Sequence, residues 1–265
     1  MARYAISDLH GHYELFKTVK DKLRTEGLLY VLGDCADRGP DGWKTLAAVI
    51  EDPQCILLLG NHELMLRDTM RDWFTLRDQL HNDEYADDDI IFAQSYCLLS
   101  MNGGEQTFWD WRKEEDLDYW YQRLQILPLR YQIFDSRCGR PIILTHAGYT
   151  PWKRPEKEED YVWNRNHFFD KWNEKEPMGD GIIIHGHTPQ EYLIEVMENC
   201  LDIDKTKFKI LGTNFQNEWH VYDLTYCDGH KICIDPGTII SKMGLMINLD
   251  TLEQEAIRFP LKKII

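Results

Sequence analysis

Five short polar clusters, each at the end of or inside an apolar run, carry the residue types that could do chemistry. They lie at 7–11, 33–39, 60–63, 145–148 and 185–188. Carboxylates, imidazoles and a carboxamide recur in them, and Mn, Fe, Zn and Co bind such mixed nitrogen and oxygen donors. The clusters therefore offer ligands for two metal ions: Asp8, His10, Asp34, Asn61, His146 and a histidine from the pair at 185 and 187.

The first two clusters combine metal ligands with a candidate phosphate-binding group. Asp8 and His10 stand two apart at a strand end, where alternate side chains face the same way and can bind one ion. Asp34 and Asp37 crowd a second strand end and repel each other unless a cation offsets them, so Asp34 is the best candidate to bridge two ions. Arg38 offers a planar fork that matches two phosphate oxygens. The alternatives are a surface pair at Asp8 and His10 and a simple Arg38–Asp37 ion pair.

The third cluster adds a neutral ligand and a candidate proton donor. Asn61 supplies a carboxamide oxygen, and His62 can hold a transferable proton near neutral pH. Asp37 could orient the His62 ring. A histidine held in this way is suited to protonate a leaving alkoxide.

The last two clusters each end an apolar strand with histidine. His146 follows one strand, and His185 and His187 follow another. Side chains two apart could both face the site, but Gly186 is expected to bend the chain, so we expect one ligand from this pair. The residue pattern does not choose between the two.

The elements that must position these clusters alternate along the chain. Short apolar runs predict buried strands, and helical spacing between the first three predicts helices. Such alternation indicates an α/β sheet, in which ligands collect at the carboxyl ends of the strands. Four later runs, at 219–224, 230–235, 245–249 and 256–259, predict hairpins in an additional, largely antiparallel sheet. The expected strands are 4–6, 28–32, 55–59, 142–144 and 182–184.

Composition predicts one globular unit of 265 residues, with an aromatic, acidic helical insertion over about 64–127. Acidic residues outnumber basic ones by 45 to 30, for a net charge of −15. We therefore expect no contact with duplex nucleic acid or an anionic membrane. No run is long enough to span a membrane, and the first motif leaves no room for a signal peptide, so we expect a cytoplasmic protein.

The cysteines are scattered and form no CxxC pair. We expect most of them to be reduced, as is usual inside cells. Cys35 stands between two motif carboxylates, where it is either a small strand-end filler or a group open to coordination or oxidation.

In their order, the motifs Asp-x-His-Gly, Gly-Asp-x-x-Asp-Arg-Gly, Gly-Asn-His-Glu, His-Ala-Gly and Gly-His-Thr resemble the phosphoprotein phosphatase branch of the calcineurin-like metallophosphoesterases, particularly its compact bacterial and phage type. The resemblance spans 7–188. It implies a single α/β domain over 1–265, a metallophosphoesterase-type β-sandwich of mixed sheets flanked by helices. It also implies two divalent or trivalent metal ions, with Mn, Fe or Zn expected.

The resemblance further implies residue roles. One ion is held by Asp8, His10 and Asp34, and the other by Asp34, Asn61, His146 and His187, which favours His187 over His185. Arg38, Arg165 and His62 bind the phosphate, and His62 paired with Asp37 is also the proton donor. Ser7 departs from the family, where Gly is usual, and Ala36 from a position that often holds Val.

The leading hypothesis is a serine/threonine protein phosphatase. A hydroxide bridging the two ions attacks phosphorus in line, and His62 acts as general acid. The partner is then a phosphorylated protein or a small phosphoester. The first alternative is a symmetrical dinucleoside tetraphosphatase, in which the aromatic insertion could stack adenine rings. The second is a catalytically inactive regulatory protein of the same fold. Substrate, native metals and oligomeric state stay open at this level.

Overall fold

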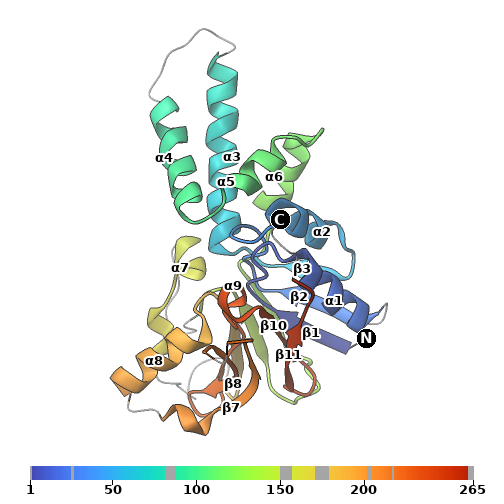
Figure 1. Ribbon diagram of the computed structural model, residues 1–265, viewed down its shortest axis with the longest axis vertical. Coiled ribbons are helices and arrows are strands. Elements are labelled where there is room, and N and C mark those ends of the chain that lie inside the picture. Colours follow the sequence, from blue (N-terminus) through green and yellow to red (C-terminus); the bar gives the residue numbers. More distant parts are fainter. Residues whose placement is uncertain are drawn as a thin grey trace.

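Two mixed β-sheets stack against each other at the centre of the molecule (Figure 1). The computed structural model describes residues 2–24, 27–80, 88–149, 157–170, 179–201, 204–216 and 218–261. The first sheet has the order β11-β10-β1-β2-β3. Its strands, in that order, are Gln254–Arg258, Met243–Asn248, Ala2–Ile6, Gly27–Val31 and Cys55–Leu57.

The second sheet has the order β4-β5-β6-β9-β8-β7. The strands β5, β6 and β9 are parallel to one another, and the pairs at either side are antiparallel. Its strands, in that order, are Arg130–Ile133, Ile142–Thr145, Ile182–His185, Lys231–Cys233, His220–Tyr226 and Lys209–Thr213.

Apolar side chains from both sheets fill the space between them. Ala5 and Ile247 of the first sheet share one buried cluster with Leu144, Ile184 and Ile232 of the second. Burial of each such Leu or Ile side chain contributes about 1.5–3 kcal/mol. The short Ile- and Leu-rich runs of the sequence are therefore the strands of a sandwich.

Helices cover the outer faces of both sheets (Figure 1). α1 (Tyr13–Leu23) and α2 (Gly42–Glu51) bury their apolar sides with the first sheet, and α8 (Gln190–Leu201) does so with the second. The connections contain short helices: α7 (Glu159–Val162), α9 (Thr238–Ser241) and the 3-10 helices η1 (Asn166–Phe168) and η2 (Lys205–Lys207). The expected α/β sandwich of mixed sheets flanked by helices is confirmed.

The prediction of an additional antiparallel sheet was wrong. β8 and β9 pair with each other, as do β10 and β11, but the two pairs belong to different sheets. β9 adds parallel to β6, and β10 adds antiparallel to the free edge of β1. The apolar runs predict strands, but they do not say which sheet edge each strand will join.

A helical segment follows β3. It contains α3 (Asn61–Leu80), α4 (Asp88–Met101), α5 (Glu105–Trp111) and α6 (Leu117–Gln125), and α3 and α4 run side by side away from the sheets (Figure 1). Part of the insertion expected at 64–127, residues 81–87, lies outside the described residues. The rings of Trp111 lie 5.6 Å from Trp73 and 5.4 Å from Phe108, so these aromatics form the segment's own core.

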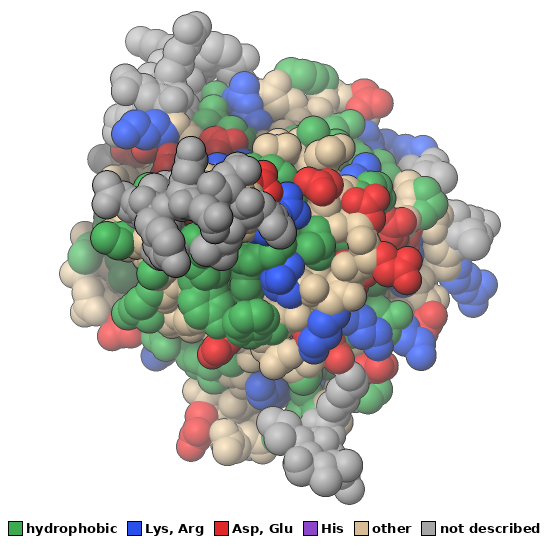
Figure 2. Space-filling view, turned by 90° about the horizontal axis from the view of Figure 1, so that it is seen from above, with side chains coloured by type: hydrophobic (Ala, Val, Ile, Leu, Met, Phe, Trp, Pro, Cys, Tyr) green, Lys and Arg blue, Asp and Glu red, His purple; other side chains and the backbone are tan. Residues whose placement is uncertain are grey.

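The surface carries both charge signs. On the face shown in Figure 2, Lys and Arg side chains lie among Asp and Glu, so the net charge of −15 does not form a uniformly acidic surface there. Among the described residues, no helix has the length and apolar character needed to cross a bilayer.

Candidate metal centre

The five polar clusters meet where strands of both sheets end. Asp8 follows β1, Asp34 follows β2 and Asn61 begins α3 just after β3, all from the first sheet. His146 follows β5 and His187 follows β6 of the second. Clusters far apart in sequence therefore face one another across the end of the sandwich: the backbone N–H of His187 donates to Asp8 Oδ2 at 3.1 Å, between residues 179 positions apart.

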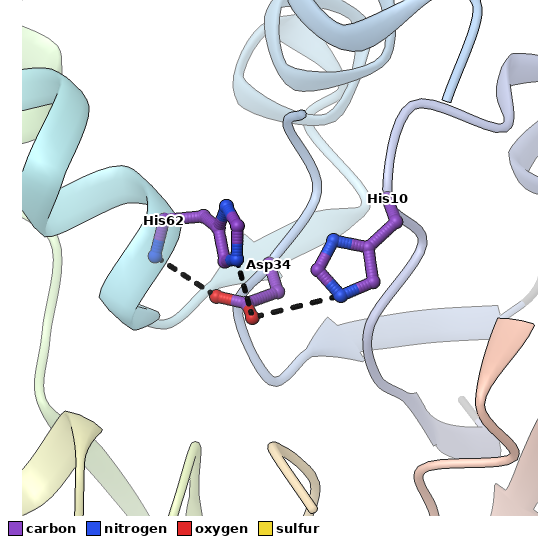
Figure 3. A group of neighbouring side chains, drawn as sticks. All are labelled: His10, Asp34 and His62. Carbon is purple, nitrogen blue, oxygen red and sulfur yellow. Dashed lines mark hydrogen bonds and ion pairs between the residues drawn. The ribbon is translucent and has the colours of Figure 1, made fainter. Parts of the chain in front are cut away.

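Asp34 lies at the centre of two groups of potential ligands. His10, Asp34 and His62 form one group (Figure 3), and Asp34, His146 and His187 form the other. Within each group the ligand atoms lie no more than 4.8 Å apart. Asp34 Oδ2 is 3.8 Å from Nε2 of both His10 and His62, and Oδ1 is 3.4 Å from His146 Nε2. This position suits a carboxylate shared by two ions.

Asp8 and Asn61 complete the two groups. Asp8 Oδ1 lies 3.9 Å from His10 Nε2. Asn61 Oδ1 lies 2.9 Å from His146 Nε2 and 2.8 Å from His187 Nδ1. The other nitrogen of His146 is 2.7 Å from the carbonyl oxygen of Leu32, so a proton on Nδ1 leaves Nε2 with a free lone pair facing the oxygens of Asp34 and Asn61. A cation between these atoms would be held by all three.

The buried groups at the site fit a pair of cations. Burial and, to a smaller extent, the nearby Asp34 carboxylate raise the pKa of Asp8 to about 6. Burial and, to a smaller extent, the nearby Glu63 carboxylate raise the pKa of Asp34 well above its usual value. Burial likewise lowers the pKa values of His146 and His187. Buried His187 Nε2 has no hydrogen-bond partner among the described residues. Bound cations would favour charged carboxylates and neutral imidazoles, and would give such a nitrogen a partner.

The backbone at the site is held in an uncommon conformation. Asp8, His10, Asp34, Arg38 and His187 all have positive φ, between 41° and 68°. Side-chain-bearing residues seldom adopt this region, and such strain is concentrated at functional sites.

Gly186 is required because of close approach. A Cβ at this position would collide with Ser7 Oγ and Asp8 Oδ2. Because glycine has no Cβ, the backbone N–H of His187 can donate to Asp8 Oδ2 at 3.1 Å. The Ser7 hydroxyl donates to the same oxygen. Ser7, which departs from the family pattern, thus directly orients the Asp8 carboxylate.

His62 and Asp37 form a buried pair. His62 Nδ1 lies 2.7 Å from Asp37 Oδ2, and His62 Nε2 has no hydrogen-bond partner among the described residues. Burial raises the pKa of Asp37 to about 7, whereas burial and Arg38 lower the pKa of His62. The hydrogen bond fixes the ring so that Nε2 faces Asp34. This is the arrangement that a positioned proton donor requires.

Two arginines flank the cluster. Arg38 is exposed, and its guanidinium NH1 lies 3.0 Å from His10 Nε2. The turn after α4 holds it, because Arg38 N–H donates to Gly103 O at 3.0 Å and Arg38 Nε donates to Asn102 O at 3.4 Å. Arg165 Nε donates to Thr188 Oγ1 at 3.3 Å, beside His187. Both guanidinium groups therefore lie beside residues of the Asp34 cluster.

His185 points away from the cluster. Its Nε2 lies 2.8 Å from the Tyr226 hydroxyl, and its ring lies 4.6 Å from the ring of His167 behind the second sheet. His187, in contrast, contacts Asn61. The geometry therefore places His187, and not His185, with the other candidate ligands.

Glu63 is a site residue that sequence reasoning missed. Its fully buried carboxylate accepts hydrogen bonds from the backbone N–H groups of Asp34 (2.7 Å), Cys35 (2.8 Å), Ala36 (3.3 Å) and Gly60 (3.1 Å). These bonds tie the loop after β2 to the start of α3. Its place as the last residue of Gly-Asn-His-Glu was the available signal.

Asp235 and Cys35 complete the surroundings. Asp235 is buried, lines a cavity of about 170 Å³ together with His10, Arg38 and His187, and accepts a 2.8 Å bond from Gly237 N–H. Burial, and then Asp8, raise its pKa. Cys35 is fully buried, and burial raises the pKa of its thiol, so it is a packed thiol; none of the seven cysteines is in a disulfide.

Comparison with known proteins gives a family match. Residues 1–212 match the calcineurin-like phosphoesterase family. Over 155 residues the chain is 32% identical to the symmetrical bis(5'-nucleosyl)-tetraphosphatase of Nitrosospira multiformis, a match covering 57% of this chain and 45% of that protein. Over 70 residues it is 39% identical to the protein of the same name from Nitrosomonas europaea, covering 25% of this chain and 26% of that protein.

These matches span less than half the length of either relative. Among solved structures, the crystal structure of a candidate diadenosine tetraphosphatase superposes with a TM-score of 0.57 at 12% identity, covering 98% of this chain and 95% of that chain. At this identity the similarity shows a shared fold.

Proposed function

Because the chain belongs to the calcineurin-like phosphoesterase family, whose members use a dimetal centre, we propose that it is a metal-dependent phosphohydrolase that cleaves dinucleoside tetraphosphates symmetrically. The two ligand groups that share Asp34 support the metal-dependent hydrolysis. The names of the curated relatives support the substrate, in place of the phosphoprotein of the leading sequence hypothesis.

The distances around Asp34 support a ligand assignment. We assign Asp8, His10 and Asp34 to one ion, and Asp34, Asn61, His146 and His187 to the other. When bound, the ions would provide a water of lowered pKa as nucleophile and neutralise charge on the phosphoryl group.

The remaining side chains serve the phosphate. Arg38 and Arg165 offer forked donors to its oxygens, and they supply local positive charge in an acidic protein. His62 Nε2 can hold a proton toward the leaving oxygen, while Asp37 fixes the ring through Nδ1. Glu63 keeps the loop that carries Asp34 in place.

The leaving group separates the two candidate substrates. An alkoxide from phosphoserine must be protonated as it departs. A nucleoside diphosphate ionises near pH 6, as phosphate groups do, and can depart as an anion at neutral pH. His62 is therefore needed far more for a phosphoprotein than for a dinucleotide.

The experiment removes metal with a chelator and restores Mn, Mg, Zn or Fe separately. Diadenosine tetraphosphate, a phosphoserine peptide and p-nitrophenyl phosphate are then offered to each form, and products are separated by chromatography. We expect ADP as the sole nucleotide product of the dinucleotide. Phosphate release from the peptide with no cleavage of the dinucleotide would replace the proposal with the protein phosphatase.

Variants test the ligand assignment. Asn61→Ala and His187→Ala should lose metal-dependent turnover, because each removes a donor from the group around Asp34. His220→Ala is the matched control, since His220 lies on β8 and bonds Glu191 outside the site. Full activity in both site variants would refute the dimetal assignment.

A further inference from the structure

A second, larger cavity adjoins the candidate metal centre. Its volume is about 500 Å³, within the range of about 300–1,000 Å³ that small-molecule sites occupy. It lies between the start of α1, the loop 38–41, the end of α9 and the described C-terminal residues 259–261. Arg38 and Ile239 line both this cavity and the 170 Å³ cavity at the metal centre. We call it the Arg38 cavity.

One part of the Arg38 cavity carries positive charge. Lys242 lines it together with Arg38, and Lys242 is half-buried. Tyr13, the first residue of α1, and Asp41, which precedes the first residue of α2, also line it, so the positive ends of two helix dipoles lie beside it. A phosphate held next to Arg38 would find a second cation at Lys242.

Another part is apolar and aromatic. Tyr13 and Phe259 line it, and the Phe259 ring lies 5.1 Å from the ring of His12. Lys44 Nζ lies 3.7 Å from the centroid of the Tyr13 ring, which fixes that ring against α2. Flat, rigid aromatic walls suit a nucleobase, because every base offers a π-face for stacking.

Two carboxylates also line the cavity, Glu14 and Asp41. They repel phosphate, but they accept hydrogen bonds from ribose hydroxyls and from the amino group of adenine. The cavity thus joins cations, acceptors and aromatic walls in one space that continues from Arg38. A nucleotide needs all three.

We propose that the Arg38 cavity binds one nucleotide half of the substrate, with its phosphate between Arg38 and Lys242 and its base against Tyr13 and Phe259. This rests on the proposed function, the hydrolysis of a dinucleoside polyphosphate. It moves base recognition away from the helical segment, where Trp73, Phe108 and Trp111 pack on one another.

The test compares Lys242→Gln and Tyr13→Leu with the wild type. Lys17→Gln is the matched control, because Lys17 is exposed on α1 and does not line the cavity. The readout is the ratio of kcat/KM for diadenosine tetraphosphate to kcat/KM for p-nitrophenyl phosphate, which has no nucleoside. We expect this ratio to fall about tenfold in Lys242→Gln and in Tyr13→Leu, because each removes one charge-assisted or stacking contact. The ratio should be unchanged in Lys17→Gln.

Product inhibition gives a second measurement. The inhibition constant of ADP should rise in both variants, whereas that of inorganic phosphate should change less. A ratio within twofold of wild type in both variants would overturn the nucleotide site while leaving the proposed function intact. No ADP from the dinucleotide with wild-type enzyme would instead overturn the proposed function. If Lys242→Gln impaired only phosphopeptide hydrolysis, the occupant would be a peptide and the nucleotide assignment would be wrong.

Discussion

Replacing Glu63 with Gln tests whether one buried carboxylate holds the loop that carries Asp34 in place. In the native protein, Oε1 accepts from Cys35 and Ala36 N–H, and Oε2 accepts from Asp34 and Gly60 N–H. Glu63→Gln turns one oxygen into an NH2 group, so two buried N–H donors lose their acceptor whichever way the amide lies. Each unsatisfied donor costs about 1–3 kcal/mol, and the variant should lose about 2–6 kcal/mol of unfolding free energy.

The assay is urea unfolding of the metal-stripped protein, with Glu195→Gln as control. Glu195 is exposed on α8, and its replacement should change the unfolding free energy by less than about 0.5 kcal/mol. Because the released loop carries Asp34, Glu63→Gln should also need more metal for half-maximal turnover. A loss below about 1 kcal/mol with an unchanged metal requirement would refute the bracing role of Glu63.

Three further outcomes follow from the site. His62→Asn should lower turnover of a phosphoserine peptide by about 100-fold to 10,000-fold, because the departing alkoxide needs a proton. Turnover of diadenosine tetraphosphate should fall far less, because its leaving group can depart as an anion. Equal losses on the two substrates would refute this role of His62. Free Mn²⁺ at 100 times its Kd should stabilise the wild type by about 2.7 kcal/mol in thermal unfolding, and Asn61→Ala should lose that gain. Burial and, to a smaller extent, the neighbouring His185 lower the pKa of His167 well below 6.5. Below pH 6.5 only the unfolded chain binds a proton at this histidine, so the free energy of unfolding should fall by up to about 1.4 kcal/mol per pH unit. In urea unfolding at a series of pH values, His167→Gln should lose less unfolding free energy than the wild type over this range.

The residues of the candidate centre could be named from the sequence because each is local to an apolar strand. Asp8 and Asp34 each follow a buried run, and parallel strands bring their carboxyl ends to one edge. The choice of His187 over His185 came from the family resemblance, because spacing alone allows either. The structure gives the physical basis: Gly186 lets the chain approach Asp8, which turns His187 inward and leaves His185 against Tyr226.

The long-range features could not be predicted. Glu63 bonds the backbone of residues 27 to 29 positions earlier, and no residue pattern encodes that contact. The assignment of β9 and β10 to different sheets depends on which edges are free once β1 and β6 have paired. The Arg38 cavity requires residues from both ends of the chain, Tyr13 and Phe259, to meet.

The positive φ angles at Asp8, His10, Asp34, Arg38 and His187 have a consequence for how the protein tolerates mutation. Glycine adopts this backbone region without strain, so a glycine at any of these positions would relieve the local backbone strain. Selection for stability alone would therefore favour replacing these residues with glycine. The polar side chains at these turns are therefore strained positions that stability alone does not account for.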